Sequence, residues 1–290
     1  MDFYYRSYSD LSAIITKNLD KFAKYNPDLI VGIPRSGMIP AYIIALFLNT
    51  NCCSFFEFYM NQKLIKYGSR TILDTINNPQ DAKRILIIDD SYGKGEKLAE
   101  LVQSLPDKIR SKCIVGVIYS AEKKLPLNSI IEFYLEYIPK PRFFEWNIYH
   151  HNLVRKSAFD IDGVLCFDPT QAENDDGEAY LSFLLNARPK FIPTLPIHTL
   201  VTSRLEKYRS QTETWLKKYK IVFTQLVMLD LPNKEERKRM NVYAKHKAEI
   251  YNNNDELVLF FESSEKQAQE IFSITKKPVF CIETNRLYNE

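Results

Sequence analysis

The sequence predicts an α/β protein of two tandem domains, each a mostly parallel sheet with flanking helices. Apolar runs alternate with segments of helical periodicity, which is the pattern of a parallel sheet covered on both faces. The alternation restarts after a polar, proline-containing stretch near the middle of the chain. At roughly 150 residues per domain, the 290 residues also indicate two domains.

Composition excludes several classes of protein. The 39 Lys and Arg against 36 Asp and Glu give a net charge of +3, which offers no bulk attraction to nucleic acid. No apolar run approaches the 18 or so residues of a membrane span, and the first residues lack the pattern of a secretion signal. Five cysteines without a CxxC pair argue against a disulfide framework or a zinc cluster. A reducing cytoplasm is therefore expected.

The first domain is predicted over residues 1–150. Leu11, Ile15 and Leu19 recur at helical spacing after Ser9 and Asp10, and later apolar runs have strand length. The polar residues 60–80 predict a mobile loop. The expected helices cover 11–22, 40–49 and 94–105, and the expected strands cover 28–33, 53–58, 84–90, 113–119 and 130–138.

The second domain is predicted over residues 151–290. The polar stretches 139–142 and 149–156 mark the boundary, and the two halves do not repeat each other. Ser157-Ala-Phe-Asp-Ile-Asp starts the new alternation as a strand. The further expected strands cover 198–201, 225–228, 257–261 and 278–282, and the expected helices cover 208–218, 234–251 and 264–273.

A first candidate site follows two strands of the first domain. The apolar run Ile85–Ile88 delivers Asp89 and Asp90 to a glycine turn before a helix, where backbone N–H groups and the helix N-terminus suit a phosphate. Carboxylates there can accept hydrogen bonds from sugar hydroxyls, although helix capping is the simpler alternative for them. The loop Gly32–Gly37, with Arg35, offers a second anion site.

These motifs resemble the type I phosphoribosyltransferases over roughly residues 25–140. The resemblance implies that Asp89 and Asp90 bind the ribose hydroxyls of phosphoribosyl pyrophosphate (PRPP), with Mg²⁺ on the pyrophosphate. Lys94 and Lys97 stand where the family usually has small hydroxyl residues. They either supply charge to the phosphate or mark a different pocket. The implied substrate-binding residues are Ser91, Tyr92, Gly93, Lys94, Gly95 and Lys97 in the phosphate turn, Arg35, Ser36 and Gly37 in the pyrophosphate loop, and Lys66 and Arg70 in the flexible loop.

A second candidate site opens the second domain. Asp160 and Asp162 lie two residues apart past a strand end, so one can act as nucleophile and the other as general acid and base. Thr202 offers a hydroxyl to phosphoryl oxygens, Lys247 offers a cation, and Glu262 offers a carboxylate to Mg²⁺. A simple turn formed by the two aspartates is the alternative.

This half resembles the haloacid dehalogenase superfamily of phosphatases over residues 157–290. The resemblance implies that Asp160 becomes an aspartyl phosphate and that Asp162 protonates the leaving oxygen and later activates water. Thr202 and Lys247 match two further motifs, with Lys245 as the competing lysine. Glu262 stands where many members carry an aspartate pair. The implied metal ligands are Asp160, Asp162 and Glu262, and Ser203, Arg204 and Arg209 are candidate substrate contacts.

Together the two resemblances predict a cytoplasmic, bifunctional enzyme that transfers 5-phosphoribosyl from PRPP to an acceptor and then removes the 5-phosphate. The gaps of about 40 residues from Asp160 to Thr202 and about 45 to Lys247 leave no room for a large cap domain. Capless phosphatases of this superfamily tend to accept bulky substrates. The pairing of the two domains resembles the dual-domain ribofuranosyltransferases of bacterial surface-polysaccharide synthesis, and this resemblance implies a glycan or lipid-linked glycan as the acceptor. The alternatives are a nucleobase acceptor such as orotate, and a non-catalytic PRPP sensor that regulates the second domain.

Two further features carry open alternatives. Trp146, in Phe143–Asn147, is either a stacking platform over the acceptor or part of an aromatic plug between the domains. The acidic stretch Asp168–Gly177 either binds a hydroxylated substrate or is a solvated loop.

Overall fold

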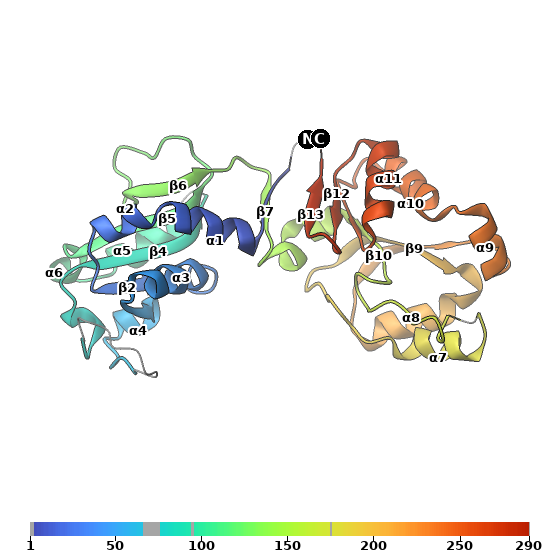
Figure 1. The fold of residues 1–290 in the computed structure, drawn as a ribbon, viewed down its shortest axis with the longest axis horizontal. Coiled ribbons are helices and arrows are strands. Elements are labelled where there is room, and N and C mark those ends of the chain that lie inside the picture. The colour runs from blue at the N-terminus through green and yellow to red at the C-terminus, as the bar shows by residue number, and fades with distance from the viewer. Residues whose placement is uncertain (1–2, 66–75, 94–95, 175, 290) are drawn as a thin grey trace. The chain divides into compact units, whose positions relative to one another are not determined.

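The structure, a computed structural model, describes residues 3–65, 76–93, 96–174 and 176–289 (Figure 1). The chain divides into two compact units. We call Arg6–Arg142 the N-terminal unit, and Met1–Tyr5 together with Phe143–Glu290 the C-terminal unit. Each unit contains a sheet flanked by helices, so the predicted α/β class with mostly parallel sheets is confirmed.

The N-terminal unit is built on a five-stranded sheet in the order β3-β2-β4-β5-β6, and every neighbouring pair is parallel. Residues such as Leu29 and Val31 alternate with Ile30 along the central strands, so each strand places apolar side chains on both faces. The strands are β2 (Leu29–Gly32), β3 (Asn51–Ser54), β4 (Ile85–Tyr92), β5 (Cys113–Ser120) and β6 (Phe133–Tyr137).

Helices cover both faces of this sheet. On one face, α3 packs on β2 and β4 and is itself contacted by α1 and α2. On the other, Phe55 and Phe58 from α4 and Leu98 and Val102 from α5 join the core. The helices are α1 (Tyr8–Lys17), α2 (Leu19–Lys24), α3 (Met38–Leu48), α4 (Phe55–Tyr59), α5 (Glu96–Gln103) and α6 (Asp107–Arg110), with a 3₁₀ turn η1 at Pro79–Asp81.

Two predicted elements of this unit differ in the structure. The strand expected over 53–58 ends at Ser54, because the Ser54 hydroxyl and the Glu57 carboxylate form a capping box that begins α4. The helix expected over 11–22 is interrupted at Asn18, whose amide donates to the carbonyl of Ile14. Of the predicted mobile loop 60–80, residues 66–75 lie outside the described residues, and the rest includes the start of η1.

The C-terminal unit is built on a six-stranded sheet in the order β10-β9-β8-β11-β12-β13. All neighbours are parallel except β12 and β13. A separate two-stranded sheet pairs β1 (Tyr4–Arg6) with β7 (Arg142–Phe144). The six strands are β8 (Ser157–Phe159), β9 (Ile197–Leu205), β10 (Phe223–Leu229), β11 (Leu259–Glu262), β12 (Val279–Cys281) and β13 (Arg286–Tyr288).

Two layers of helices enclose the six-stranded sheet. Phe183 of α7 and Trp215 of α8 pack with Phe159 and Phe261 on one face, while α10 and α11 cover the other through residues such as Tyr251. The helices are α7 (Glu178–Asn186), α8 (Arg209–Lys218), α9 (Lys234–Met240), α10 (Tyr243–Asn252) and α11 (Glu265–Thr275), with 3₁₀ turns η2 (Ile148–His150), η3 (Asn152–Lys156) and η4 (Glu206–Tyr208).

The long helix expected over 234–251 is two helices. Asn241 ends α9 in the left-handed region at φ 48°, and α10 begins at Tyr243. The sequence analysis did not anticipate α7 or the antiparallel edge strand β13. Phe143, placed by prediction near the acceptor, is buried against Phe3 and Phe280 in the core of the C-terminal unit.

Each sheet has a point where its strand order reverses. In the N-terminal unit β2 and β4 are neighbours although β3 follows β2 in the chain, and in the C-terminal unit β11 returns beside β8. In open α/β sheets, ligands bind beyond the carboxyl ends of the strands at such reversals. These two places are therefore where functional side chains are expected.

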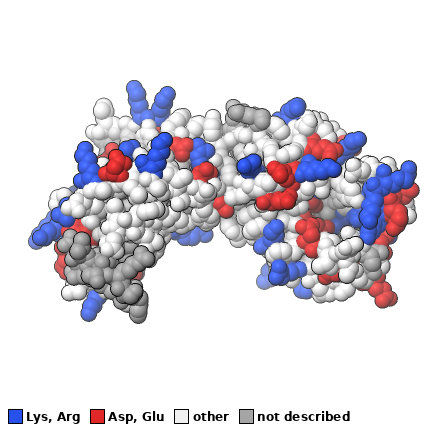
Figure 2. Space-filling view, viewed as in Figure 1, with Lys and Arg blue, Asp and Glu red and all other residues white. Residues whose placement is uncertain are grey.

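On the face drawn in Figure 2, basic and acidic residues are interspersed, and the helix α9 itself contains residues of both signs. Within the described ranges, no helix is long and apolar enough to cross a bilayer.

Candidate active sites

The strand β4 carries the two carboxylates of the first site. Asp89 and Asp90 lie inside the strand, which continues to Tyr92, and the Asp89 carboxylate accepts a hydrogen bond from the Asp90 N–H at 2.8 Å. Asp90 is buried. Burial, followed by the negative charge of Asp90, raises the pKa of Asp89 to about 8. The pair therefore favours one shared proton over two adjacent charges.

The predicted pyrophosphate loop meets this pair. A Cβ atom on Gly37 would lie 2.6 Å from the Ile33 carbonyl and 2.8 Å from Asp89 Oδ1, so only glycine fits between them. The loop between β2 and α3 also contains the exposed Arg35 and the half-buried Ser36, and its Pro34–Arg35 peptide bond is cis. The structure thus brings the two predicted motifs of the first site together at the reversal point of the sheet.

Several residues of the predicted phosphate turn belong to β4 and α5. Ser91 and Tyr92 belong to β4, and Tyr92 is buried, while Gly93 follows the strand and Lys97 is an exposed residue of α5. Sequence reasoning missed Arg142, which is buried and donates to the Tyr92 and Ile138 carbonyls, so that it fixes the end of β4. The predicted residues Lys66, Arg70, Lys94 and Gly95 lie outside the described residues.

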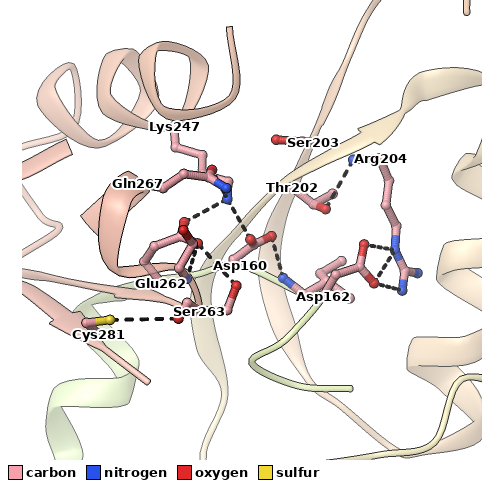
Figure 3. A network of polar contacts seen from close by, with 12 residues as sticks. Asp160, Asp162, Thr202, Ser203, Arg204, Lys247, Glu262, Ser263, Gln267 and Cys281 are labelled. Carbon is pink, nitrogen blue, oxygen red and sulfur yellow. Dashed lines mark hydrogen bonds and ion pairs between the residues drawn. The ribbon is translucent and has the colours of Figure 1, made fainter. Parts of the chain in front are cut away.

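The second site centres on one lysine shared by two carboxylates (Figure 3). Lys247 Nζ, from α10, lies 2.6 Å from Asp160 Oδ2 and 2.7 Å from Glu262 Oε2. Asp160 directly follows β8, and Glu262 ends β11, the strand that lies beside β8. The structure therefore brings three predicted site residues together, and the lysine that reaches both carboxylates is Lys247, whereas Lys245 is exposed.

Electrostatics in this cluster follow from burial. Burial raises the pKa of Asp160, and the charges of Glu262 and Asp162 raise it further against the opposing effect of Lys247, to about 7. Burial lowers the pKa of Lys247, but its two carboxylate partners outweigh that effect and raise it overall. Lys247 is therefore a permanent cation that orients the nucleophile predicted at Asp160.

Asp162 has a separate cation. Arg204 is fully buried, and its Nε and Nη2 atoms donate to both Asp162 carboxylate oxygens, with the shortest contact at 2.6 Å. Burial raises the pKa of Asp162, but the charge and hydrogen bonds of Arg204 lower it below its ordinary value. The predicted substrate contact Arg204 is thus committed to Asp162, and the predicted contact Arg209 pairs instead with Glu206 and Glu213.

A cavity of about 190 Å³ opens on these residues. Its wall includes Asp160, Asp162, Thr202, Ser203 and Lys247, so five predicted residues face one space. Sequence reasoning missed two other residues of the wall, Arg237 of α9 and Gln267 of α11. Their sequence context gives little signal, because both stand in helices rich in polar and charged residues.

The acidic stretch Asp168–Gly177 was predicted either to bind a hydroxylated substrate or to be a solvated loop, and its residues differ in their surroundings. Asp168 and Asn174 line the cavity. Glu173 instead accepts hydrogen bonds from Thr170, and Asp176 pairs with Lys207 and Tyr208.

The three predicted magnesium ligands do not form a common metal site. Both Asp162 oxygens are held by Arg204, and Lys247 lies between the carboxylates of Asp160 and Glu262. In the part of the chain that the structure describes, no group of three His, Cys, Asp or Glu side chains is placed to hold a metal ion. The same ranges contain five cysteines, all with free thiols.

No protein-family model and no curated protein sequence matches the chain. Solved structures similar to it include three phosphoribosyltransferases. The purine phosphoribosyltransferase of Pyrococcus horikoshii is 22% identical with a TM-score of 0.37, over 50% of this chain and 94% of that one. The xanthine-guanine-hypoxanthine enzyme of Helicobacter pylori is 16% identical with a TM-score of 0.38, over 51% and 93%. The HGPRTase of Leishmania tarentolae is 12% identical with a TM-score of 0.32, over 46% and 79%.

Proposed function

We propose that the chain is a bifunctional enzyme. The N-terminal unit transfers 5-phosphoribosyl from PRPP to an acceptor, and the C-terminal unit then hydrolyses the 5-phosphate. Loss of the phosphate makes the combined transfer irreversible and leaves a plain ribofuranosyl group on the acceptor.

One observation carries the phosphatase assignment. The carboxylate of Asp160 is held by a buried lysine at the wall of a cavity, at the reversal point of its sheet. A purely structural ion pair has no need of a cavity, whereas a carboxylate nucleophile must be both oriented and accessible. Thr202, in the same wall, provides a hydroxyl that can donate to a phosphoryl oxygen.

The proposed hydrolysis has two steps. An oxygen of Asp160 attacks phosphorus, the phosphorus–ester oxygen bond breaks, and the departing alkoxide takes a proton from solvent. Water then attacks the aspartyl phosphate and Asp162 accepts its proton; the bond between phosphorus and Asp160 breaks, phosphate leaves with Asp160 restored, and Asp162 releases the proton to solvent. Arg204 keeps Asp162 ionised, which suits the second step and disfavours the predicted role of Asp162 as an acid in the first.

The transferase assignment is supported by the contact between the loop at Gly37 and Asp89. The loop offers N–H groups for a pyrophosphate, and the Asp89–Asp90 pair offers acceptors for vicinal ribose hydroxyls. In the proposed reaction the acceptor oxygen or nitrogen bonds to C1 of the ribose, pyrophosphate departs with the electron pair, and the acceptor loses a proton to solvent.

We propose a hydroxylated glycan as the acceptor. Among the described residues between β8 and β9 (160–174 and 176–196), the C-terminal unit forms the helix α7 and loops, with no cap domain inserted. An open phosphatase site admits a phosphate attached to a large molecule. A nucleobase acceptor is the competing outcome of the test below.

The phosphatase is tested by phosphate release from sugar phosphates and nucleoside monophosphates. Asp160→Asn should reduce kcat by at least about 10³-fold, because an amide does not attack phosphorus. The exposed Asp230→Asn, at the end of β10, is the matched control and should retain full activity. Unchanged phosphate release by the Asp160 variant would reject the nucleophile.

The transferase is tested by pyrophosphate release from PRPP with a panel of glycans and nucleobases. Release only with glycans supports the proposal, and release only with nucleobases replaces it by nucleotide metabolism. Asp90→Asn should abolish release, whereas the exposed Asp81→Asn should not. PRPP binding without release for any acceptor would favour a sensor.

A further inference from the structure

The ammonium of Lys247 has no hydrogen left for a substrate. It carries three N–H groups, and these meet Asp160 Oδ2 at 2.6 Å, Glu262 Oε2 at 2.7 Å and Gln267 Oε1 at 3.0 Å. The side chain is also almost completely buried. Lys247 therefore orients Asp160, and a bound phosphoryl group needs another cation.

The wall of the same cavity contains two buried donors without a partner, Ser203 Oγ and Arg237 Nε. Arg237 is only 9% exposed. Its Nη1 donates to the Ser203 carbonyl at 2.7 Å, which ties the guanidinium to the end of β9 next to Thr202. Among the described residues it forms no ion pair with a carboxylate, in contrast to its helix neighbour Arg239, which is exposed and pairs with Glu236.

A buried guanidinium without a carboxylate partner is costly to keep, even with the hydrogen bonds that Arg237 forms to the Ser203 carbonyl and to the Tyr180 side chain. Removing a charge from water is expensive unless a partner compensates, and an unsatisfied buried donor adds to that cost. An anion with several acceptor oxygens would satisfy Arg237 Nε and Ser203 Oγ together. The wall of the cavity thus contains two buried hydrogen-bond donors that an oxyanion would satisfy, and the proposed nucleophile lies in the same wall.

We propose that Arg237, with Ser203, binds the phosphoryl group that Asp160 attacks. This inference rests on the proposed phosphatase activity and assigns different roles to two cations. Lys247 positions the nucleophile, and Arg237 neutralises the charge on the phosphoryl oxygens. The ligand is a tetrahedral oxyanion, either a phosphate monoester or free orthophosphate, and the phosphate product is held by the same contacts.

The test measures oxyanion binding apart from turnover. Orthophosphate and orthovanadate are titrated calorimetrically into the full-length wild type and into Arg237→Gln, Arg237→Lys and the matched control Arg239→Gln. Arg237→Gln should raise both dissociation constants at least about tenfold, since hydrogen bonds to charged groups contribute about 1.5–3 kcal/mol each. Arg237→Lys should recover part of the affinity, and Arg239→Gln should bind as the wild type does.

A thermal readout separates binding from folding. Orthophosphate should raise the Tm of the wild type and of Arg239→Gln, and this increase should disappear in Arg237→Gln. Equal affinity of Arg237→Gln and wild type, or no oxyanion binding by the wild type, overturns the inference. Oxyanion binding through Arg237 without any phosphate release from esters would instead reject the phosphatase, and with it the catalytic role of the site, and leave only an oxyanion-binding site at Arg237.

Discussion

The guanidinium of Arg204 holds both carboxylate oxygens of Asp162 in the interior of the C-terminal unit. Arg204 lies near the end of β9, and its Nη2 also donates to Cys166 Sγ. The two aspartates of the site are thus fixed differently, since the nucleophile Asp160 shares its cation with Glu262 whereas Asp162 has its own.

Breaking this pair should destabilise the fold. Arg204→Met leaves the Asp162 carboxylate without its cation, and breaking a buried pair costs about 3–5 kcal/mol. Adding Asp162→Asn should recover much of that loss, because the remaining charge is removed as well. Urea unfolding of the single and double variants measures both effects. Arg209→Met, which removes a surface ion pair, is the control and should cost less than about 1 kcal/mol. A small effect of Arg204→Met would contradict the buried pair.

Phosphate release should depend on pH through Asp160. The nucleophile must be ionised, and the pKa of Asp160 is raised to about 7 by burial and by Glu262 and Asp162. Activity should therefore rise with pH through about 7 instead of about 4. Glu262→Gln removes a negative charge that raises this pKa, so the acidic limb of kcat/KM should move to lower pH. An acidic limb that stays in place in this variant would show that another group titrates.

The strands could be predicted from the sequence because buried parallel strands are short apolar runs. Ile85–Ile88 and Leu259–Phe261 are of this kind, and the carboxylates that follow them mark the ends where ligands bind. Helix boundaries were harder. Ser54-Phe-Phe-Glu57 is a capping-box pattern that would have ended the strand at Ser54, and Asn241 is the signal that divides the predicted helix 234–251.

The partners of Arg204 and Arg237 could not be predicted from the sequence, because they depend on which face of a strand or helix is buried. Arg204 and Arg237 both follow polar sequence, and neither spacing nor composition separates them from solvent-exposed arginines such as Arg209. Only the packed structure shows that Arg204 reaches Asp162 and that Arg237 reaches the cavity. The convergence of Asp160, Lys247 and Glu262 followed from the family resemblance, and the structure supplies its geometry.

The stability of the N-terminal unit should depend on pH through Asp89. Its pKa is raised to about 8, so between about pH 4 and pH 8 the folded state holds a proton that the unfolded state has lost. Stability then falls as the pH rises through that range, by less than about 1.4 kcal/mol per pH unit. The Asp89→Asn variant lacks this pH dependence, so its free energy of unfolding relative to that of the wild type should increase from pH 5 to pH 8. Urea unfolding midpoints at both pH values measure this difference. In the control Asp81→Asn, the midpoint should change with pH as it does in the wild type.

The Gly32–Gly37 loop packs closely against Asp89, so alanine substitutions at Gly37 and at Gly93 should differ in their effect on stability. In Gly37→Ala the new methyl group would meet the Ile33 carbonyl at 2.6 Å and Asp89 Oδ1 at 2.8 Å, so the loop must shift. Overpacking of this kind costs about 1–3 kcal/mol, and the displaced loop should also weaken PRPP binding. In Gly93→Ala the nearest atom is the flexible Lys140 Nζ at 3.5 Å, so unfolding free energy should change little. Urea unfolding and calorimetric titration of PRPP measure the two effects, and equal stability of the two variants would contradict the close approach at Gly37.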